Sequence, residues 1–248
     1  MNKAIFCTAG HSGALSYARK ILSDQGFQFI DRKDPDVTHL LLPVPSFEAD
    51  GRIKGGGILE NVLADLPEDI TVIGGNLSHP ILQGYHKIDL LQDTMYVAQN
   101  AAITADCAIR VAGTHLTTTF RDCPTLVIGW GRIGKCLSTL LKEMGCRITV
   151  AVRKESDRCM LAALGFDGIL ISEIPEYLPQ QRLIFNTVPA LVLEESQLRR
   201  CRPDRILIEL ASQPGIVGAN VIPALGLPGR FAPEASGDLI ARTILRYL

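Results

Sequence analysis

The 248-residue sequence lacks the features that mark a membrane, secreted or nucleic-acid-binding protein. Its longest mainly apolar runs, such as Thr38–Val44 and Ile206–Ala211, fall far short of the roughly 20 residues that a membrane helix needs. The 25 basic and 26 acidic side chains leave a formal net charge of -1, so no global field would attract nucleic acid or an anionic membrane. No long apolar segment with a cleavage site follows Met1, which predicts a cytoplasmic protein without a signal peptide.

Cysteine and histidine are scarce in the arrangements that bind metals. The seven cysteines are scattered and form no C-x-x-C pair, which predicts reduced thiols rather than disulfides or a zinc site. No two of the five histidines are three or four residues apart, so we expect no metal site. None follows His115, and the second half of the chain therefore lacks the histidine that commonly acts as base in the oxidation of an alcohol.

What the sequence does contain is the pattern of an α/β protein. Hydrophobic residues make up 47% and charged residues 21%, and short β-rich runs alternate with helical stretches, which predicts parallel sheets. We expect a smaller flavodoxin-like α/β domain over residues 1–95, on the substrate side, and a long connecting helix over 96–119. A Rossmann dinucleotide-binding domain is expected over 120–232, and a C-terminal helix over 233–248, with packing back on the first domain as one option.

The strongest local signal is a glycine-rich turn between a strand and a helix. The strand-like segment Thr125–Ile128 leads into Gly129-Trp130-Gly131-Arg132-Ile133-Gly134. In such a G-x-G-x-x-G turn the first glycine allows the bend, the second lets a pyrophosphate approach the backbone, and the third lets helix and strand pack closely. A second predicted strand at Arg147–Val152 completes the expected strand–helix–strand motif. The sequence therefore predicts dinucleotide binding by Gly129, Gly131, Arg132, Ile133 and Gly134.

Residues after three predicted strands bear on the identity and placement of the dinucleotide. NAD sites usually carry an acid at the end of the second strand, whereas this strand ends Val152-Arg153-Lys154. Arg153 and Lys154 suit the 2′-phosphate of NADP, so NADP is favoured over NAD, with a solvated loop as the alternative. Asn186, Thr187 and Val188 precede Pro189, where Rossmann proteins often approach the nicotinamide ribose, and Ala211 completes the expected cofactor-binding set.

Four stretches together resemble the family of dipicolinate synthase A subunits. They are Gly129–Gly134, Asn186–Pro189, Leu207–Gly215 and Gly226–Pro233. The last two look like that family's D-L-A-S-R-P-G-G and G-L-P-G-x-x-A-P, and Asn100–Asp106 is more faintly similar to its N-S-I-P-T-x-E-G. The likeness covers most of residues 95–248 and is thin before that.

The resemblance implies an NAD(P)-dependent oxidoreductase that makes dipicolinate during sporulation. Its substrate would be the small dicarboxylate dihydrodipicolinate, or the hydroxylated tetrahydro precursor, and its partner would be a flavoprotein-like B subunit. We also expect a homo-oligomer. Aromatisation of a dihydropyridine needs hydride removal and a proton acceptor but no alcohol base, which agrees with a cofactor domain without histidine.

Departures from the family keep two alternatives open. Gln213 and Glu234 stand where the family has Arg and Lys, and Ile216 replaces a glycine. Two cations are thus missing from a site meant for a dicarboxylate. The alternatives are an oxidoreductase acting on another cyclic imine or amino-acid-derived substrate, and an NAD(P)-binding subunit whose partner performs the chemistry.

Candidate catalytic and substrate-binding residues come from this resemblance and from the expected position of the cleft. We expect a cleft between the domains, at the carboxyl ends of the strands. Asp106, which aligns with a family glutamate, is the first candidate proton acceptor, with Thr104 beside it, although a solvated helix face is the alternative for Asp106. Ser212 is the third catalytic candidate, as a donor to a carboxylate or to the nicotinamide amide. The substrate-binding candidates are Arg230 and the Gly55-Gly56-Gly57 turn, where Gly56 and Gly57 form either an anion site or a plain flexible loop.

Overall fold

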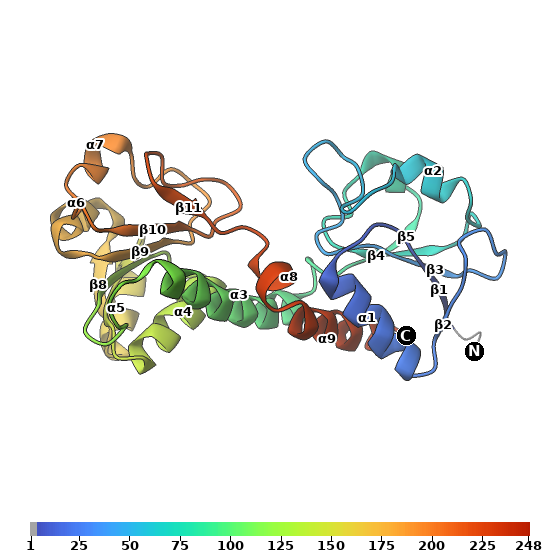
Figure 1. The fold of residues 1–248 in the computed structure, drawn as a ribbon, viewed down its shortest axis with the longest axis horizontal. Coiled ribbons are helices and arrows are strands. Elements are labelled where there is room, and N and C mark those ends of the chain that lie inside the picture. Colours follow the sequence, from blue (N-terminus) through green and yellow to red (C-terminus); the bar gives the residue numbers. More distant parts are fainter. Residues whose placement is uncertain (1–3) are drawn as a thin grey trace. The chain divides into compact units, whose positions relative to one another are not determined.

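The computed structural model describes residues 4–248 and divides the chain into two compact units. The first unit comprises Met1–Asn100 together with Pro228–Leu248, and the second comprises Ala101–Leu227. Each unit contains one parallel sheet with helices packed against it (Figure 1). The division falls inside α3 (Thr94–His115), the longest helix of the described chain. None of the helices in residues 4–248 is both long and apolar enough to cross a bilayer.

The first unit has the strand order of flavodoxin-like domains. Its sheet runs β2-β1-β3-β4-β5 with every neighbouring pair parallel. The strands are β1 (Ile5–Thr8), β2 (Gln28–Phe29), β3 (His39–Leu41), β4 (Thr71–Gly74) and β5 (His86–Asp89). The helices are α1 (Gly13–Asp24), α2 (Leu59–Leu63), the 3-10 turn η1 (Pro80–Leu82) and α9 (Pro233–Ile244). The two central strands bury Leu40, Leu41, Val72 and Ile73 completely, as expected for a parallel sheet covered on both faces.

Helices α1 and α9 lie side by side in the first unit at very short range (Figure 1). A Cβ atom added at Gly237 would lie 2.4 Å from the Tyr17 Cβ and 2.7 Å from the Ala14 carbonyl oxygen. Four residues earlier on both helices, a Cβ at Gly13 would lie 2.9 Å from the Pro233 Cβ. The two glycines therefore let the backbones approach, and the C-terminal helix is part of the first unit.

Asp93 joins the start of α3 to the C-terminal segment. Its carboxylate accepts the Tyr96 N–H at 2.7 Å, the Arg246 guanidinium at 3.0 Å and the Tyr247 hydroxyl at 2.8 Å. These donors, with the Tyr96 amide first, lower the pKa of Asp93 to about 2. The ionised carboxylate therefore stabilises both the helix start and the chain end.

We expect the first unit to lose stability as the pH falls from about 4 towards about 2. A carboxyl group with a lowered pKa in the folded state stabilises the fold above its unfolded pKa of about 3.9, and this contribution is lost as the pH falls through the folded value. Asp93→Asn keeps a capping side chain without the charge. In thermal unfolding followed by circular dichroism, its midpoint should lie below that of wild type at about pH 5 and approach it at about pH 2. An equal difference at both pH values would contradict this role of the charge.

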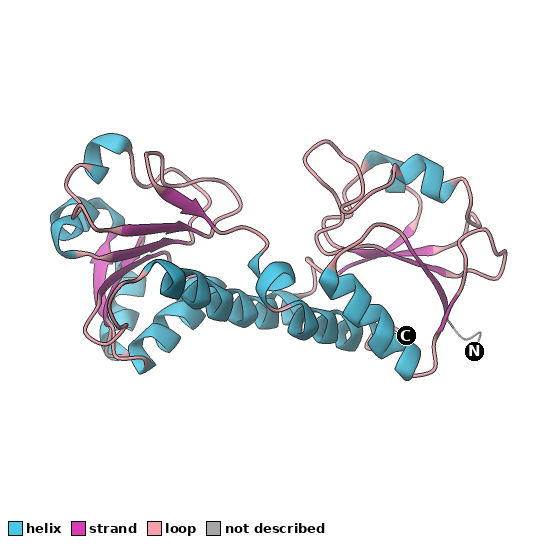
Figure 2. Cartoon of the chain, in the orientation of Figure 1, coloured by secondary structure: helices cyan, strands magenta, loops and turns pink. Residues whose placement is uncertain are grey.

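The second unit has the strand order of the Rossmann fold. Its sheet runs β11-β10-β9-β6-β7-β8 with all pairs parallel, which is the 3-2-1-4-5-6 order when followed from β8. Figure 2 draws the strands of both sheets in magenta and the helices around them in cyan. The strands are β6 (Pro124–Ile128), β7 (Arg147–Val152), β8 (Asp167–Leu170), β9 (Leu183–Asn186), β10 (Ile206–Glu209) and β11 (Val221–Pro223). The helices are α4 (Arg132–Glu143), α5 (Glu155–Ala163), η2 (Ile171–Glu173), α6 (Ile174–Tyr177), η3 (Leu178–Gln180), α7 (Glu195–Leu198) and α8 (Leu227–Phe231), the last of which crosses into the first unit. The predicted fold class, a Rossmann unit with a flavodoxin-like α/β unit, is confirmed.

The chain reverses its direction across this second sheet between β6 and β9. In open parallel sheets ligands bind at this switch point, outside the carboxyl ends of the strands. Both strands are buried over most of their length, with Leu126, Val127, Ile128, Ile184 and Phe185 all inaccessible to solvent. A rigid core therefore supports the loops that follow β6 and β9.

Candidate dinucleotide-binding site

The glycine-rich turn is short because its glycines allow close backbone contacts. Strand β6 ends at Ile128 and α4 begins at Arg132. Gly129 has a φ of 104°, and a Cβ there would lie 2.4 Å from the Thr187 Oγ1. Gly134 lies in the first turn of α4, where a Cβ would lie 2.1 Å from the Gly129 carbonyl oxygen. These two glycines pack the strand, the turn and the helix together.

Gly131 has a different environment. It is the N-cap residue of α4, its backbone is extended, and a Cβ there would meet no heavy atom within 4 Å. No side chain caps this 12-residue helix, and the positive end of its dipole lies beside the open space at Gly131. A pyrophosphate needs both features, and the residues present therefore fit the central part of a dinucleotide.

A cavity of about 410 Å³ extends from this turn, and we call it the glycine-turn cavity. It is lined by Gly129, Trp130, Gly131, Val152, Arg153, Lys154, Asp157, Ile171, Thr187, Val188 and Pro189. The structure thus brings together the turn, the two cations after β7 and the segment after β9. Five further cofactor-binding candidates are absent from the lining, namely Arg132, Ile133, Gly134, Asn186 and Ala211.

The wall of the glycine-turn cavity beyond β7 carries more positive than negative charge. Val152, the last residue of β7, is buried where NAD sites usually have an acid. Arg153 and Lys154 are exposed, and neither belongs to an ion pair among residues 4–248. The carboxylate in the lining is that of Asp157, in the first turn of α5. Two cations and one acid leave a wall that suits a phosphate group.

The segment after β9 is held by side chains rather than by regular structure. The Thr187 hydroxyl donates to the Ile128 carbonyl at 2.9 Å and so ties this segment to β6. The Asn186 amide donates to the Val188 carbonyl and accepts the Val188 N–H, both at 3.0 Å. Asn186 is itself fully buried. It shapes the turn that places Thr187 and Val188 at the cavity.

The three catalytic candidates lie outside the lining of the glycine-turn cavity. Thr104 is buried on α3, whereas the Asp106 side chain is 53% exposed and pairs with Arg110 at 2.7 Å, one helical turn later. Asp106 thus has the surroundings of a surface helix ion pair, the alternative that its sequence position left open. Ser212 is exposed in the loop after β10.

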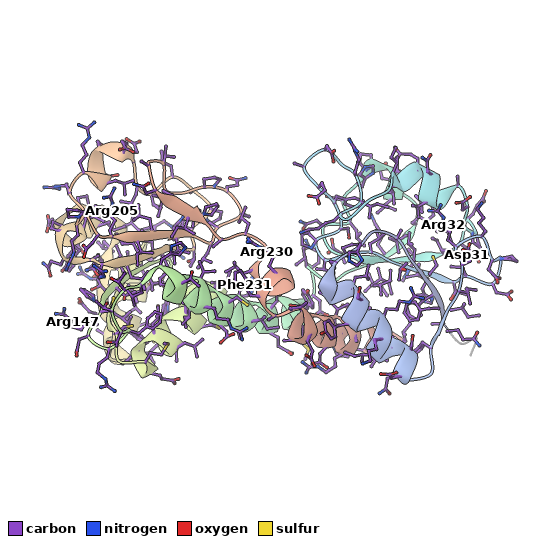
Figure 3. The ribbon with its side chains drawn as sticks, viewed as in Figure 1. Asp31, Arg32, Arg147, Arg205, Arg230 and Phe231 are labelled. Atoms are coloured by element: carbon purple, nitrogen blue, oxygen red, sulfur yellow. The ribbon has the colours of Figure 1, made fainter. Side chains whose placement is uncertain are left out.

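The three substrate-binding candidates belong to the first unit. Arg230 is exposed on α8, with its guanidinium 5.5 Å from the centre of the Phe231 ring (Figure 3). The Gly56 N–H already donates to the Ile53 carbonyl at 3.0 Å, so it is not free for an anion.

The helix that follows this turn is short. Helix α2 has five residues, Leu59–Leu63, and its dipole is correspondingly small. A Cβ at Gly55 would lie 2.2 Å from the His11 carbonyl oxygen, which means that the turn packs closely against the start of α1. The turn is therefore a packed feature of the fold.

Two polar residues near the site were absent from the sequence predictions. Asp157 lines the glycine-turn cavity, and Glu209 ends β10 with only 4% of its surface exposed. A signal for Glu209 was present, because an acid inside the apolar run Ile206–Ala211 is costly to bury unless it is hydrogen-bonded. No group of three or more histidine, cysteine or acidic residues in the described chain is arranged to hold a metal ion.

Comparison with known proteins supports the fold and the family resemblance. No protein-family model matches the chain. The dipicolinate synthase A subunit of Bacillus subtilis (strain 168) is 25% identical over 157 residues, which cover 60% of this chain and 53% of that protein. The alignment thus spans about half of the length of this curated relative.

Solved structures resemble the chain over nearly its whole length. The structure of the dipicolinate synthase A subunit from Bacillus halodurans has a TM-score of 0.84 at 21% identity and covers 100% of this chain and 98% of that one. The structure of the A chain of dipicolinate synthase from Bacillus subtilis has a TM-score of 0.82 at 19% identity and covers 100% of this chain and 96% of that one. The structure of a transhydrogenase from Sinorhizobium meliloti has a TM-score of 0.73 at 13% identity and covers 98% of this chain and 92% of that one. At these identities the structures show a shared fold.

Proposed function

The chain is related to the family of dipicolinate synthase A subunits, and on this premise we propose that it is a cytoplasmic NAD(P)-dependent oxidoreductase. The observation that carries the proposal is the open space before Gly131 at the uncapped start of α4. Gly129 through Gly134 would hold the pyrophosphate there, and Thr187 and Val188 would line the path of the nicotinamide half. The bound dinucleotide would supply the hydride acceptor.

NADP is the proposed cofactor, because Arg153 and Lys154 line the glycine-turn cavity and form no ion pair with any described residue. We expect NADP to bind more tightly than NAD, and Arg153→Ala to narrow the difference by about 1–3 kcal/mol, the size of a charge-assisted hydrogen bond. Isothermal titration calorimetry with each dinucleotide measures both affinities. Arg199→Ala, which removes an exposed arginine that does not line the cavity, is the control. A wild-type preference for NAD would remove Arg153 from the site and point to Asp157 as the partner of the ribose hydroxyls.

The proposed substrate is dihydrodipicolinate or its hydroxylated tetrahydro precursor. Oxidation of the dihydro compound removes one hydride, which passes to the oxidised dinucleotide, and one proton, which a protein group or water accepts. Asp106 is our first candidate for that acceptor, with Thr104 and Ser212 as the other candidate catalytic groups. Following the family, we propose that a flavoprotein-like B subunit works with this chain in dipicolinate biosynthesis during sporulation, and that the chain forms a homo-oligomer.

A dicarboxylate needs cations or converging N–H groups, and Arg230 is the candidate cation. Arg230→Ala should weaken dipicolinate binding by at least about 1.5 kcal/mol, the loss expected for a hydrogen bond to a charged group. Calorimetric titration of the full chain with dipicolinate measures the change. Arg242→Ala, which removes an exposed arginine paired with Asp238 in the same unit, should leave the affinity unchanged. Equal binding by Arg230→Ala and wild type would remove Arg230 from the substrate site.

A binding subunit without catalysis is the second candidate function. It is favoured by the ion pair that engages Asp106 and by the replacement of two family cations by Gln213 and Glu234. Glu234 lies in the first turn of α9, where an acid stabilises the helix, so its presence has a structural reason. Turnover of dihydrodipicolinate by the purified chain alone, compared with turnover by the chain together with its flavoprotein-like partner, separates the two functions.

A further inference from the structure

The carboxylate of Glu209 is buried and accepts hydrogen bonds on both oxygens. Oε1 accepts from the Asn186 amide at 2.8 Å and the Ala211 N–H at 2.9 Å. Oε2 accepts from Asn186 at 3.0 Å and from the backbone N–H groups of Gly215 and Ile216 at 2.8 and 3.0 Å. Each of these five contacts comes from a donor, so both carboxylate oxygens act as acceptors. The arrangement is built for the charged carboxylate.

This negative charge has no cationic partner in the described chain. None of the ion pairs among residues 4–248 includes Glu209. Acids are rarely buried without a cation, because leaving water costs several kcal/mol, on the order of 5, that hydrogen bonds alone repay only in part. The charge of Glu209 is therefore held by hydrogen bonds alone, three of which come from backbone amides of the loop after β10.

The position of Glu209 relative to the glycine turn places its charge towards one half of the dinucleotide. In the sheet, β6 with its turn lies between β7 and β9, and β10 lies beyond β9. Arg153 after β7 is the proposed partner of the adenosine ribose, so the nicotinamide half extends the other way, over the ends of β9 and β10. The Asn186 amide that donates to Glu209 also donates to the Val188 carbonyl, and Val188 lines the glycine-turn cavity.

We propose that Glu209 is a positioning residue whose negative charge favours binding of the oxidised, cationic nicotinamide ring over binding of the reduced, neutral ring. The inference rests on the proposed dinucleotide function. A fixed negative charge inside a low-dielectric region acts over more than a contact distance, and it stabilises a positive ring while leaving a neutral one nearly unaffected. The same charge holds the loop after β10 in place through three backbone amides. It thereby biases the bound cofactor towards the state that accepts a hydride.

The test compares dissociation constants of the oxidised and reduced forms of whichever dinucleotide the wild type binds. The reduced form is titrated by its fluorescence, and the oxidised form by displacement. In wild type the oxidised form should bind at least as tightly as the reduced form. Glu209→Gln should weaken binding of the oxidised form at least about fivefold and that of the reduced form less than about twofold. Glu209→Asp, which keeps the charge, should retain most of the wild-type ratio.

A matched control distinguishes the effect of the Glu209 charge from the effect of a change in the protein's net charge. Glu195→Gln removes an exposed acid of α7 in the same unit and should leave the ratio unchanged. Equal weakening of both forms in Glu209→Gln would overturn the proposal, because a merely structural carboxylate does not distinguish the two rings. If Glu209→Gln does not fold, the ratio of the two dissociation constants in wild type tests the proposal instead. Tighter binding of the reduced form by wild type would then overturn it. Failure of both forms to bind wild type would instead overturn the proposed function itself.

Discussion

Gly131→Val is expected to abolish dinucleotide binding while the second unit stays folded. The Gly131 backbone is extended, a conformation that valine adopts readily, and its missing side chain borders no protein atom within 4 Å. The valine methyl groups would instead occupy the space that a pyrophosphate needs before α4. We expect at least an approximately 100-fold loss of affinity, about 2.7 kcal/mol, because the central phosphates lose their backbone contacts.

Two further glycine variants make this result specific. Gly113→Val adds the same side chain on α3, where a Cβ would be in ordinary contact with Phe120 at 3.8 Å, and should bind dinucleotide as wild type does. Gly134→Val, by contrast, should disrupt the unit, because its Cβ would collide with the Gly129 carbonyl oxygen. Calorimetry gives the affinities and circular dichroism the folded state. Wild-type affinity in a folded Gly131→Val protein would show that the pyrophosphate binds elsewhere.

The central elements of both sheets follow from the sequence because their pattern is local. Strand β7 (Arg147–Val152) has the bounds that its apolar run predicts. Strands β5 and β11 were not predicted, since β5 buries Ile88 but exposes His86 and Lys87, and β11 has three residues and ends in a proline. Such edge strands form because a neighbouring strand offers hydrogen bonds, which no local pattern encodes.

The same difference between local patterns and distant contacts explains which parts of the site the sequence predicts. The requirements on Gly129 and Gly134 are steric and are visible in residue identity and spacing. The contacts of Glu209 join residues up to 23 positions apart, and their partners are mostly backbone amides that any residue carries. Asp157 reaches the glycine-turn cavity because α5 begins at Glu155, a boundary that sequence patterns locate only roughly. Polar roles set by loop conformation therefore emerge only from the structure.

Gly237→Val is expected to destabilise the first unit strongly without changing dinucleotide binding by the second. Its Cβ would lie 2.4 Å from the Tyr17 Cβ and within 3 Å of two backbone atoms of α1, so helices α1 and α9 must move apart. Overpacking of this kind costs about 2–3 kcal/mol, which corresponds to a fall of roughly 6–12 °C in the unfolding midpoint. The better helix propensity of valine offsets only a few tenths of a kcal/mol, on the order of 0.3.

Ala235→Val is the matched control, because Ala235 is exposed two residues earlier on the same helix. It carries the cost of a β-branched side chain in α9 without the collision, and its midpoint should lie within about 2 °C of wild type. Differential scanning calorimetry of the full chain, with and without dinucleotide, measures both effects in one experiment. The dinucleotide should raise the transition of the second unit equally in all three proteins, because its site consists of residues of that unit alone. An unchanged midpoint in Gly237→Val would mean that the close approach of α1 and α9 contributes little to holding the C-terminal helix in place.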